Sequence, residues 1–146
     1  MITENYLSCL CKSYYDLKYS LFKVIEHMCK EEGLTVLQTM MLFLIRSEGS
    51  LSVGDLSNYF NITHSNASTL CKKLERDGLL CRTRSKKDER SVLISVTDHG
   101  CEMIDRMLER GKGFAAALDD VPQNKLDAIV QTIDEATEML KKMSSD

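Results

Sequence analysis

Apolar residues recur at steps of three and four near the start of the chain, which is the spacing of one face of an α-helix. The stripe consists of Leu7, Leu10, Tyr14, Leu17, Leu21, Val24 and Met28. At about 1.5 Å per residue it predicts a first helix of about forty ångström. A second helix is predicted to begin at Thr35, because Thr35 and Gln38 have the spacing of a capping box. That segment is apolar on most sides and is expected to be buried, through Leu37, Met40, Met41, Phe43 and Leu44.

Two shorter helices with a tight turn between them are predicted next. Ser52 can accept a backbone N–H at the start of the first, and Asp55 stands three positions further on. Leu56 and Phe60 supply the buried side of this helix. Asn61 can adopt the left-handed conformation that ends a helix, so the chain is expected to turn there.

The second short helix is expected to begin after Thr63, whose hydroxyl can cap it, and to stop at Gly78. Its inward positions are Ala67, Leu70, Cys71 and Leu74. Its outward positions are Ser65, Asn66, Ser68, Thr69, Lys72 and Lys73. Small polar side chains suit a surface that enters a major groove, where Asn can bond adenine and Lys can neutralise phosphate. For a helix taken alone, a solvated polar face is the competing interpretation.

Two segments of alternating residues, 79–83 and 90–96, predict the strands of a β-hairpin. In the second segment one side carries Val92, Ile94 and Val96, and the other carries Ser91, Leu93 and Ser95. The hairpin is basic, with Arg82, Arg84, Lys86, Lys87 and Arg90. This suits a wing that lies along a DNA backbone or places an arginine in the minor groove. Asp88 is expected to pair with Arg90 and to hold the tip in shape.

Helix, turn, helix and basic hairpin in this order predict a winged helix-turn-helix that binds double-stranded DNA. The candidate DNA-binding residues are Thr63, His64, Ser65, Asn66, Ser68, Thr69, Lys72, Lys73, Arg82, Arg84, Lys86, Lys87 and Arg90, with Asp88 as a wing-structuring residue. The net charge of −3 does not oppose this, because residues 63–95 hold eight Lys and Arg against four Asp and Glu. Local charge governs phosphate attraction within a Debye length of roughly 8 Å.

The run from Asp77 to Thr97 resembles the wing region of the MarR (multiple antibiotic resistance regulator) family. The resemblance rests on the Gly78-Leu79 helix stop, the Asp88-x-Arg90 pair and the Ser95-x-Thr97 exit. It implies a mainly α fold of six helices and a two-stranded β wing, with a long first helix, a second helix, the winged unit and two long helices in order. The recognition helix departs from the commonest pattern of the family, which often has Arg where this chain has His64 and Thr69.

We expect a single MarR-type domain over residues 1–146, with the winged unit at 34–96 and dimerisation helices at 1–30 and 98–146. Thr97 is expected to cap a helix that reaches about Leu118, and Pro122 suits the first turn of a last helix. The last helix has Leu126, Ile129, Ile133 and Leu140 on one face. One small domain cannot bury all of these stripes, which predicts a two-fold homodimer on a pseudo-palindromic site. The resemblance implies the same dimer, and a transcriptional repressor as its function.

The six cysteines, without a secretory signal or dense disulfide spacing, predict free thiols in a reducing cytoplasm. Cys11 and Tyr15 lie one helical turn apart, so the phenol could hydrogen-bond a thiolate. This pair is similar to that of the organic-hydroperoxide repressors of the family, which implies Cys11 and Tyr15 as candidate redox residues. The further tyrosines of that branch correspond here to Ile25 and Val36. A plain buried cysteine, or one in the wall of a ligand pocket, is the alternative.

A small apolar or phenolic ligand is the second candidate trigger for release from DNA. The family often binds such effectors beside its first two helices, which implies Tyr14, His27, Met40, Met41 and Phe43 as candidate pocket residues. A stripe of Met and aromatic residues at helical spacing is otherwise ordinary core.

Enzyme function is not predicted, because the chain shows no Gly-rich phosphate loop, no Ser-His-Asp setting and no metal-ligand cluster. We therefore expect neither a cofactor nor a metal, and the absence of a long apolar span argues against a membrane partner. A helical protein-interaction module without DNA binding is the remaining alternative, and the basic hairpin argues against it.

Overall fold

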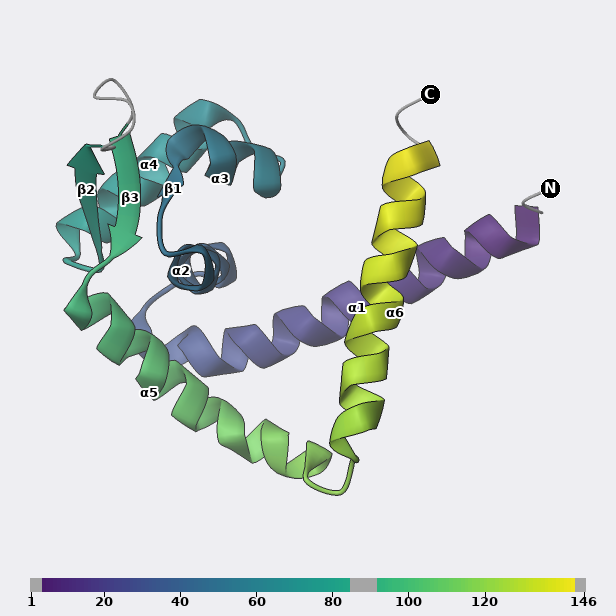
Figure 1. Cartoon of the computed structure of the whole chain (residues 1–146). Helices are drawn as coiled ribbons and strands as arrows, with labels where there is room; N and C mark the ends of the chain where they lie inside the picture. The colour runs from purple at the N-terminus through teal and green to yellow at the C-terminus, as the bar shows by residue number, and fades with distance from the viewer. Residues whose placement is uncertain (1–3, 85–91, 144–146) are drawn as a thin grey trace. The chain divides into compact units, whose positions relative to one another are not determined.

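The protein is described here by a computed structural model in which residues 4–84 and 92–143 can be described. The elements run in the order α1 (Glu4–Cys29), η1 (Lys30–Glu32), α2 (Val36–Glu48), β1 (Leu51–Ser52), α3 (Val53–Tyr59), α4 (His64–Arg76), β2 (Leu80–Arg84), β3 (Val92–Val96), α5 (Asp98–Ala115), η2 (Ala116–Leu118) and α6 (Gln123–Met143) (Figure 1). The chain divides into two compact units, Met1–Gly111 and Lys112–Asp146, and each is described by itself. The mainly helical fold class with six α-helices in the described ranges is confirmed.

The second helix begins where its capping box predicts. The Thr35 hydroxyl accepts the N–H of Gln38 at 3.3 Å, and the Gln38 side chain accepts the N–H of Thr35 at 3.0 Å. Gln38 is almost fully buried by this exchange. A capping box satisfies backbone N–H groups that would otherwise lack partners at a helix start, so the exchange between Thr35 and Gln38 fixes the first residue of α2.

The strands form one antiparallel sheet in the order β1-β3-β2. β2 and β3 pair from Leu80 opposite Val96 to Arg84 opposite Val92, which confirms the hairpin. The sheet has a third strand that the two-stranded prediction missed, because Leu51 and Ser52 pair with β3. The reason is local: Ser52 caps α3, a capping residue has extended backbone, and extended backbone can pair with a strand.

The core of the first unit gathers residues from the end of α1, from α2, α3, α4, both hairpin strands and α5. Its fully buried members include Met41, Leu42, Leu74, Ile94 and Met107. Alternation in β3 is only partly as predicted. Ile94 is buried and Val96 half-buried, but Val92 is 42% exposed, because it stands at the far end of the hairpin and away from this core.

The first helix is buried only near its end. Val24 packs against the core and Met28 belongs to it, whereas Leu7, Tyr14, Leu17 and Leu21 are each at least half exposed. In the second unit α6 buries none of its residues, and Ile129, Val130, Ile133 and Leu140 are among those exposed. Both helices therefore present large apolar surface within a single chain. No helix of the described ranges combines the length and the apolar character that crossing a membrane requires.

Thr97 joins the start of α5 to Gly78 and Leu79, the residues that follow α4. Its N–H donates to the carbonyl of Leu79 at 3.1 Å, and its hydroxyl donates to the carbonyl of Gly78 at 2.6 Å. The same hydroxyl accepts the N–H of Gly100 at 3.0 Å, so the predicted cap is confirmed. Gly100 lies so close to Leu79 that a Cβ on it would be 2.4 Å from the Leu79 carbonyl oxygen.

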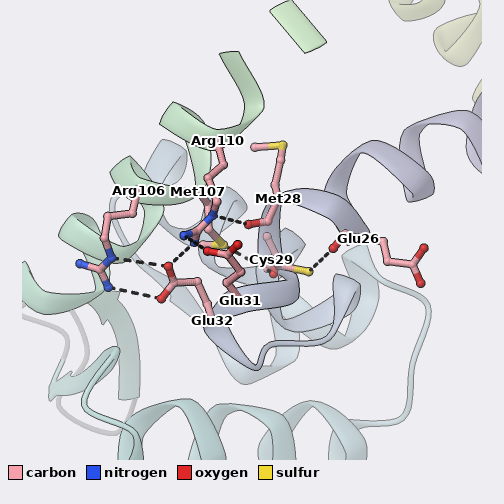
Figure 2. A network of polar contacts seen from close by, with 9 residues as sticks. Glu26, Met28, Cys29, Glu31, Glu32, Arg106, Met107 and Arg110 are labelled. Atoms are coloured by element: carbon pink, nitrogen blue, oxygen red, sulfur yellow. Dashed lines mark hydrogen bonds and ion pairs between the residues drawn. The ribbon is translucent and has the colours of Figure 1, made fainter. Parts of the chain in front are cut away.

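Farther along, two arginines of α5 hold the segment after α1 (Figure 2). Arg106 contacts the Glu32 carboxylate at 3.4 Å, and Arg110 pairs with the other oxygen of that group. Arg110 also contacts Glu31 at 3.2 Å and donates to the carbonyl of Met28 at 3.3 Å. These contacts hold the pKa of Glu32 below its ordinary value of 4.5, mainly through the hydrogen bond from Arg110.

Candidate DNA-binding interface

The helix-turn-helix is fixed by two side-chain caps and one left-handed residue. Ser52 accepts the N–H of Asp55 at 3.1 Å while Asp55 accepts from the N–H of Ser52 at 2.9 Å, which starts α3. The Ser52 hydroxyl donates to the Asp55 carboxylate at 2.7 Å, and this bond, together with the one from the Ser52 N–H, lowers the pKa of the Asp55 carboxyl. Asn61 turns the chain with φ of 49°. Thr63 then accepts the N–H of Asn66 at 3.2 Å and starts α4. All three sequence predictions for this turn are confirmed.

The recognition helix α4 has one buried side and one exposed polar side. Ala67, Cys71 and Leu74 are at most 1% exposed, so the helix cannot rotate without breaking the core. Burial also raises the pKa of the Cys71 thiol, which makes it a packing residue rather than a nucleophile. The exposed residues of the helix and its cap include Thr63, His64, Ser65, Asn66, Thr69, Lys72, Lys73 and Arg76. Ser68 and Leu70 are half-buried at the border between the two sides.

Two of the predicted DNA-contact residues, Thr63 and Thr69, already use their hydroxyl groups in hydrogen bonds within the chain. The hydroxyl of Thr63 is the helix cap, so its oxygen already accepts a hydrogen bond. The hydroxyl of Thr69 donates to the carbonyl of Ser65 at 2.9 Å, which leaves its oxygen lone pairs as acceptors for a base or a solvent donor. Asn66 is exposed three residues before Thr69 on the same helix, and its side-chain amide has both donors and an acceptor to offer.

Arg82 has a different environment from the one the sequence suggested. Its guanidinium donates to the Glu75 carboxylate at 2.9 Å, and so links strand β2 to the last turn of α4. Both side chains are about one-third exposed, at 32% and 39%. Arg82 is thereby held in a contact within the chain. The sequence analysis did not predict the pairing of Arg82 with Glu75, because the two residues meet only when β2 runs back along α4.

The wing itself is described only at its base. Arg84 ends β2 as an exposed residue opposite Val92. Lys86, Lys87, Asp88 and Arg90 lie outside the described residues, so their DNA contacts and the pairing of Asp88 with Arg90 stay predictions. What the structure establishes is that β2 and β3 pair as far as Arg84 opposite Val92, and that β2 lies beside α4 (Figure 1).

The candidate effector residues differ widely in burial. Tyr14 and His27 are exposed on α1, Met40 and Phe43 are half-buried on α2, and Met41 is fully buried in the core. Met41 is therefore a packing residue in this arrangement. An effector site formed by these five residues stays a prediction.

The candidate redox pair lies on the exposed part of α1. Cys11 and Tyr15 are both exposed, and the Tyr15 ring packs edge-on against Tyr14 at 5.2 Å between ring centroids. The six cysteines are free thiols. Within the described ranges, no three His, Cys, Asp or Glu side chains gather in a way that could hold a metal ion.

A comparison of this chain with protein families matches residues 23–107 to the family described as transcriptional regulator SarA/Rot. This chain is a member of the SarA/Rot family. The match spans α2, the helix-turn-helix, the hairpin and part of α5, which are the elements that build the interface described above.

A curated relative and two solved structures are also similar to this chain. The SarA/Rot-family chain is 29% identical to the HTH-type transcriptional regulator SarZ of Staphylococcus epidermidis over 99% of its length and 92% of the relative. A MarR family protein from Bacillus stearothermophilus has the same fold with a TM-score of 0.75 at 22% identity, over 97% and 99% of the two chains. Reduced AbfR bound to DNA is similar too, with a TM-score of 0.71 at 22% identity over 94% and 93%.

These findings confirm the class that the sequence predicted. The SarA/Rot-family chain is a DNA-binding transcriptional regulator with a MarR-type winged helix-turn-helix fold. The matched family and the relative are both described as transcriptional regulators.

Proposed function

We propose that this protein acts as a homodimeric repressor that inserts helix α4 into the major groove of a pseudo-palindromic operator. The observation that carries the proposal is the division of α4 into a buried side and an exposed polar side. Because Ala67, Cys71 and Leu74 fix the rotation of the helix, Asn66 and its exposed neighbours can only face outward. The basic segment after Arg84 would then lie along the adjacent backbone or minor groove.

The homodimer part of the proposal is supported by apolar surface that one chain leaves exposed. On α1 this surface includes Tyr6, Leu7, Tyr14, Leu17 and Leu21, and on α6 it includes Ile129, Ile133, Met139 and Leu140. Contiguous apolar stripes of this size are rare on monomers, and a second copy could cover them. A two-fold dimer would present two α4 helices to half-sites about one helical turn apart.

Within the interface we assign different roles to different side chains. Asn66 is assigned to base reading, since an exposed amide can bond adenine at two atoms. Lys72 and Lys73 are assigned to phosphates, since their charge attracts any sequence. Arg82 is assigned to positioning the wing through Glu75 rather than to a direct contact.

Fluorescence anisotropy with a duplex from the upstream region of the protein's own coding sequence tests these roles. Asn66→Ala is expected to reduce discrimination against a mismatched operator by roughly 1–3 kcal/mol while leaving binding to random DNA unchanged. Lys72→Ala is expected to weaken both duplexes and to lower the slope of log affinity against log salt by about one. Lys30→Ala, an exposed lysine of η1, serves as the matched charge control. Equal losses on cognate and random DNA for Asn66→Ala would contradict its base-reading role.

The release mechanism divides into two candidates that the same titration separates. Cys11 is accessible to oxidation because its side chain is exposed on α1, and the thiolate is the form of cysteine that attacks a peroxide. If cumene hydroperoxide releases the wild type but not Cys11→Ser, oxidation is the trigger. If both proteins stay bound, a small apolar or phenolic ligand near Tyr14, His27, Met40, Met41 and Phe43 becomes the candidate instead. Acting on operators would also place the working protein in the cytoplasm, where its DNA lies.

A further inference from the structure

A hollow of about 290 Å³ lies among the end of α2, strand β1 and helix α3. Its lining residues are Leu44, Glu48, Leu51, Asp55 and Tyr59. Leu44 and Leu51 also pack on the core, so they form an apolar floor. None of the five belongs to the recognition helix α4 or to the β2–β3 hairpin, although Asp55 and Tyr59 lie on α3, the first helix of the helix-turn-helix.

Two helices supply matched pairs of side chains to this hollow. Leu44 and Glu48 are four residues apart on α2, and Asp55 and Tyr59 are four residues apart on α3, so each pair occupies one helical face. Each face thus offers one carboxylate together with one apolar or aromatic side chain. Leu51 of β1 lies between them in sequence and completes the lining.

The charge of the hollow is negative and is not compensated by neighbouring side chains in the described part of the chain. Glu48 is exposed and forms no ion pair with any described residue. Asp55 accepts hydrogen bonds from the Ser52 N–H and hydroxyl, which favours its ionised form. Glu48 is also the last residue of α2, and the carbonyl end of a helix carries partial negative charge that favours cations.

The aromatic member adds a cation-binding surface. Tyr59 is 67% exposed although its neighbour Phe60 packs on the core, and the two rings meet edge-on at 5.1 Å between centroids. An exposed phenol ring attracts ammonium groups through the negative charge density of its face. The volume is near the lower limit for small-molecule sites, which is roughly 300 Å³.

From these observations we propose that this hollow binds a small organic cation, an ammonium group carried on an apolar body. The ammonium would lie between the carboxylates of Glu48 and Asp55 and against the Tyr59 ring, while the apolar part covers Leu44 and Leu51. DNA is excluded as an occupant, because two carboxylates repel phosphate. The inference goes beyond the DNA-binding proposal and does not depend on it.

The test is an NMR titration of the ¹⁵N-labelled full chain with benzyltrimethylammonium at constant ionic strength. We expect saturable shifts at amides of residues 44–59 with a Kd of roughly a few millimolar, given the small size of the probe. Benzyl alcohol, which keeps the ring and lacks the charge, is expected to bind at least about fivefold more weakly. Shifts centred elsewhere, no saturation, or equal binding of benzyl alcohol would overturn the proposal.

Variants then assign the binding to the lining residues. Glu48→Gln and Tyr59→Leu are each expected to weaken the probe roughly two- to fivefold, because each removes one exposed charge or ring contact. Asp55 is left intact, since it caps α3. Glu102→Gln, an exposed carboxylate of α5, is the matched control and is expected to leave the Kd unchanged. An unchanged Kd in both hollow variants would overturn the assignment, and the wild-type shift map decides independently of whether either variant folds.

Discussion

Replacing Gly100 by alanine is expected to destabilise the contact between the start of α5 and Leu79. A Cβ at this position would lie 2.4 Å from the Leu79 carbonyl oxygen and 2.6 Å from a methyl of Val96. The oxygen is backbone and already accepts the N–H of Thr97, so it cannot move away without breaking that bond. Relief of the clash therefore requires α5 to shift away from the Leu79 carbonyl.

The size of the effect follows from three contributions. Forcing extra volume into a packed site costs about 1–3 kcal/mol. Losing the Thr97 to Leu79 hydrogen bond costs about 1 kcal/mol more. Alanine favours a helix over glycine by about 0.5–1 kcal/mol, which offsets part of the loss. The net expectation is a decrease in the free energy of unfolding of about 1–3.5 kcal/mol.

Urea denaturation followed by circular dichroism, at matched protein concentration, measures this change. Gly54→Ala is the control, because a Cβ there meets only the Ser52 hydroxyl oxygen at an ordinary 3.5 Å. That variant is expected to be as stable as the wild type or slightly more stable. A Gly100→Ala protein that unfolds at the wild-type urea concentration would refute the close approach of α5 to the Leu79 carbonyl.

Three further outcomes are expected. Glu32→Gln removes a carboxylate held by two arginines and should lower the free energy of unfolding by about 1–2 kcal/mol at pH 7. Because the folded pKa of Glu32 is lowered, its stabilising contribution is present above 4.5 and is lost as pH falls through the folded pKa, so a gap between wild type and variant that does not narrow as pH is lowered below 4.5 would contradict this. Thr63→Ala removes the cap of α4 and should lower the free energy of unfolding by about 0.5–2 kcal/mol, measured by thermal unfolding. Thr132→Ala, at an exposed threonine inside α6, is the control. Glu75→Gln should weaken DNA binding as Arg82→Ala does if Arg82 positions the wing, whereas stronger binding would show that the freed Arg82 contacts phosphate.

The sequence predicts those structural features that depend on residues three or four positions apart. The boxes at Thr35 and Ser52 and the cap at Thr63 each involve a hydroxyl and an N–H within one turn, so the residue types alone indicate them. The left-handed Asn61 is a property of a single residue. The buried side of α4 follows from helical periodicity, and the structure confirms it at Ala67, Cys71 and Leu74.

Contacts between residues far apart in sequence could not be predicted in the same way. Glu32 meets Arg106 and Arg110 across separations of 74 and 78 residues, and each of these side chains alone resembles an ordinary surface charge. Glu75 and Arg82 meet only because β2 runs back along α4. The hollow at Tyr59 depends on how α2 and α3 converge on β1, which no local pattern encodes.

The short strand β1 has a consequence for the behaviour of the protein at high concentration. Exposed sheet edges offer unpaired backbone groups to other chains and promote aggregation. Here one edge of the sheet is only Leu51 and Ser52, and the chain turns into α3 directly after them. The opposite edge is β2, whose outer half carries Arg82 and Arg84. A short edge on one side and a charged edge on the other leave little opportunity for sheet extension, so contacts between copies are directed to the helices.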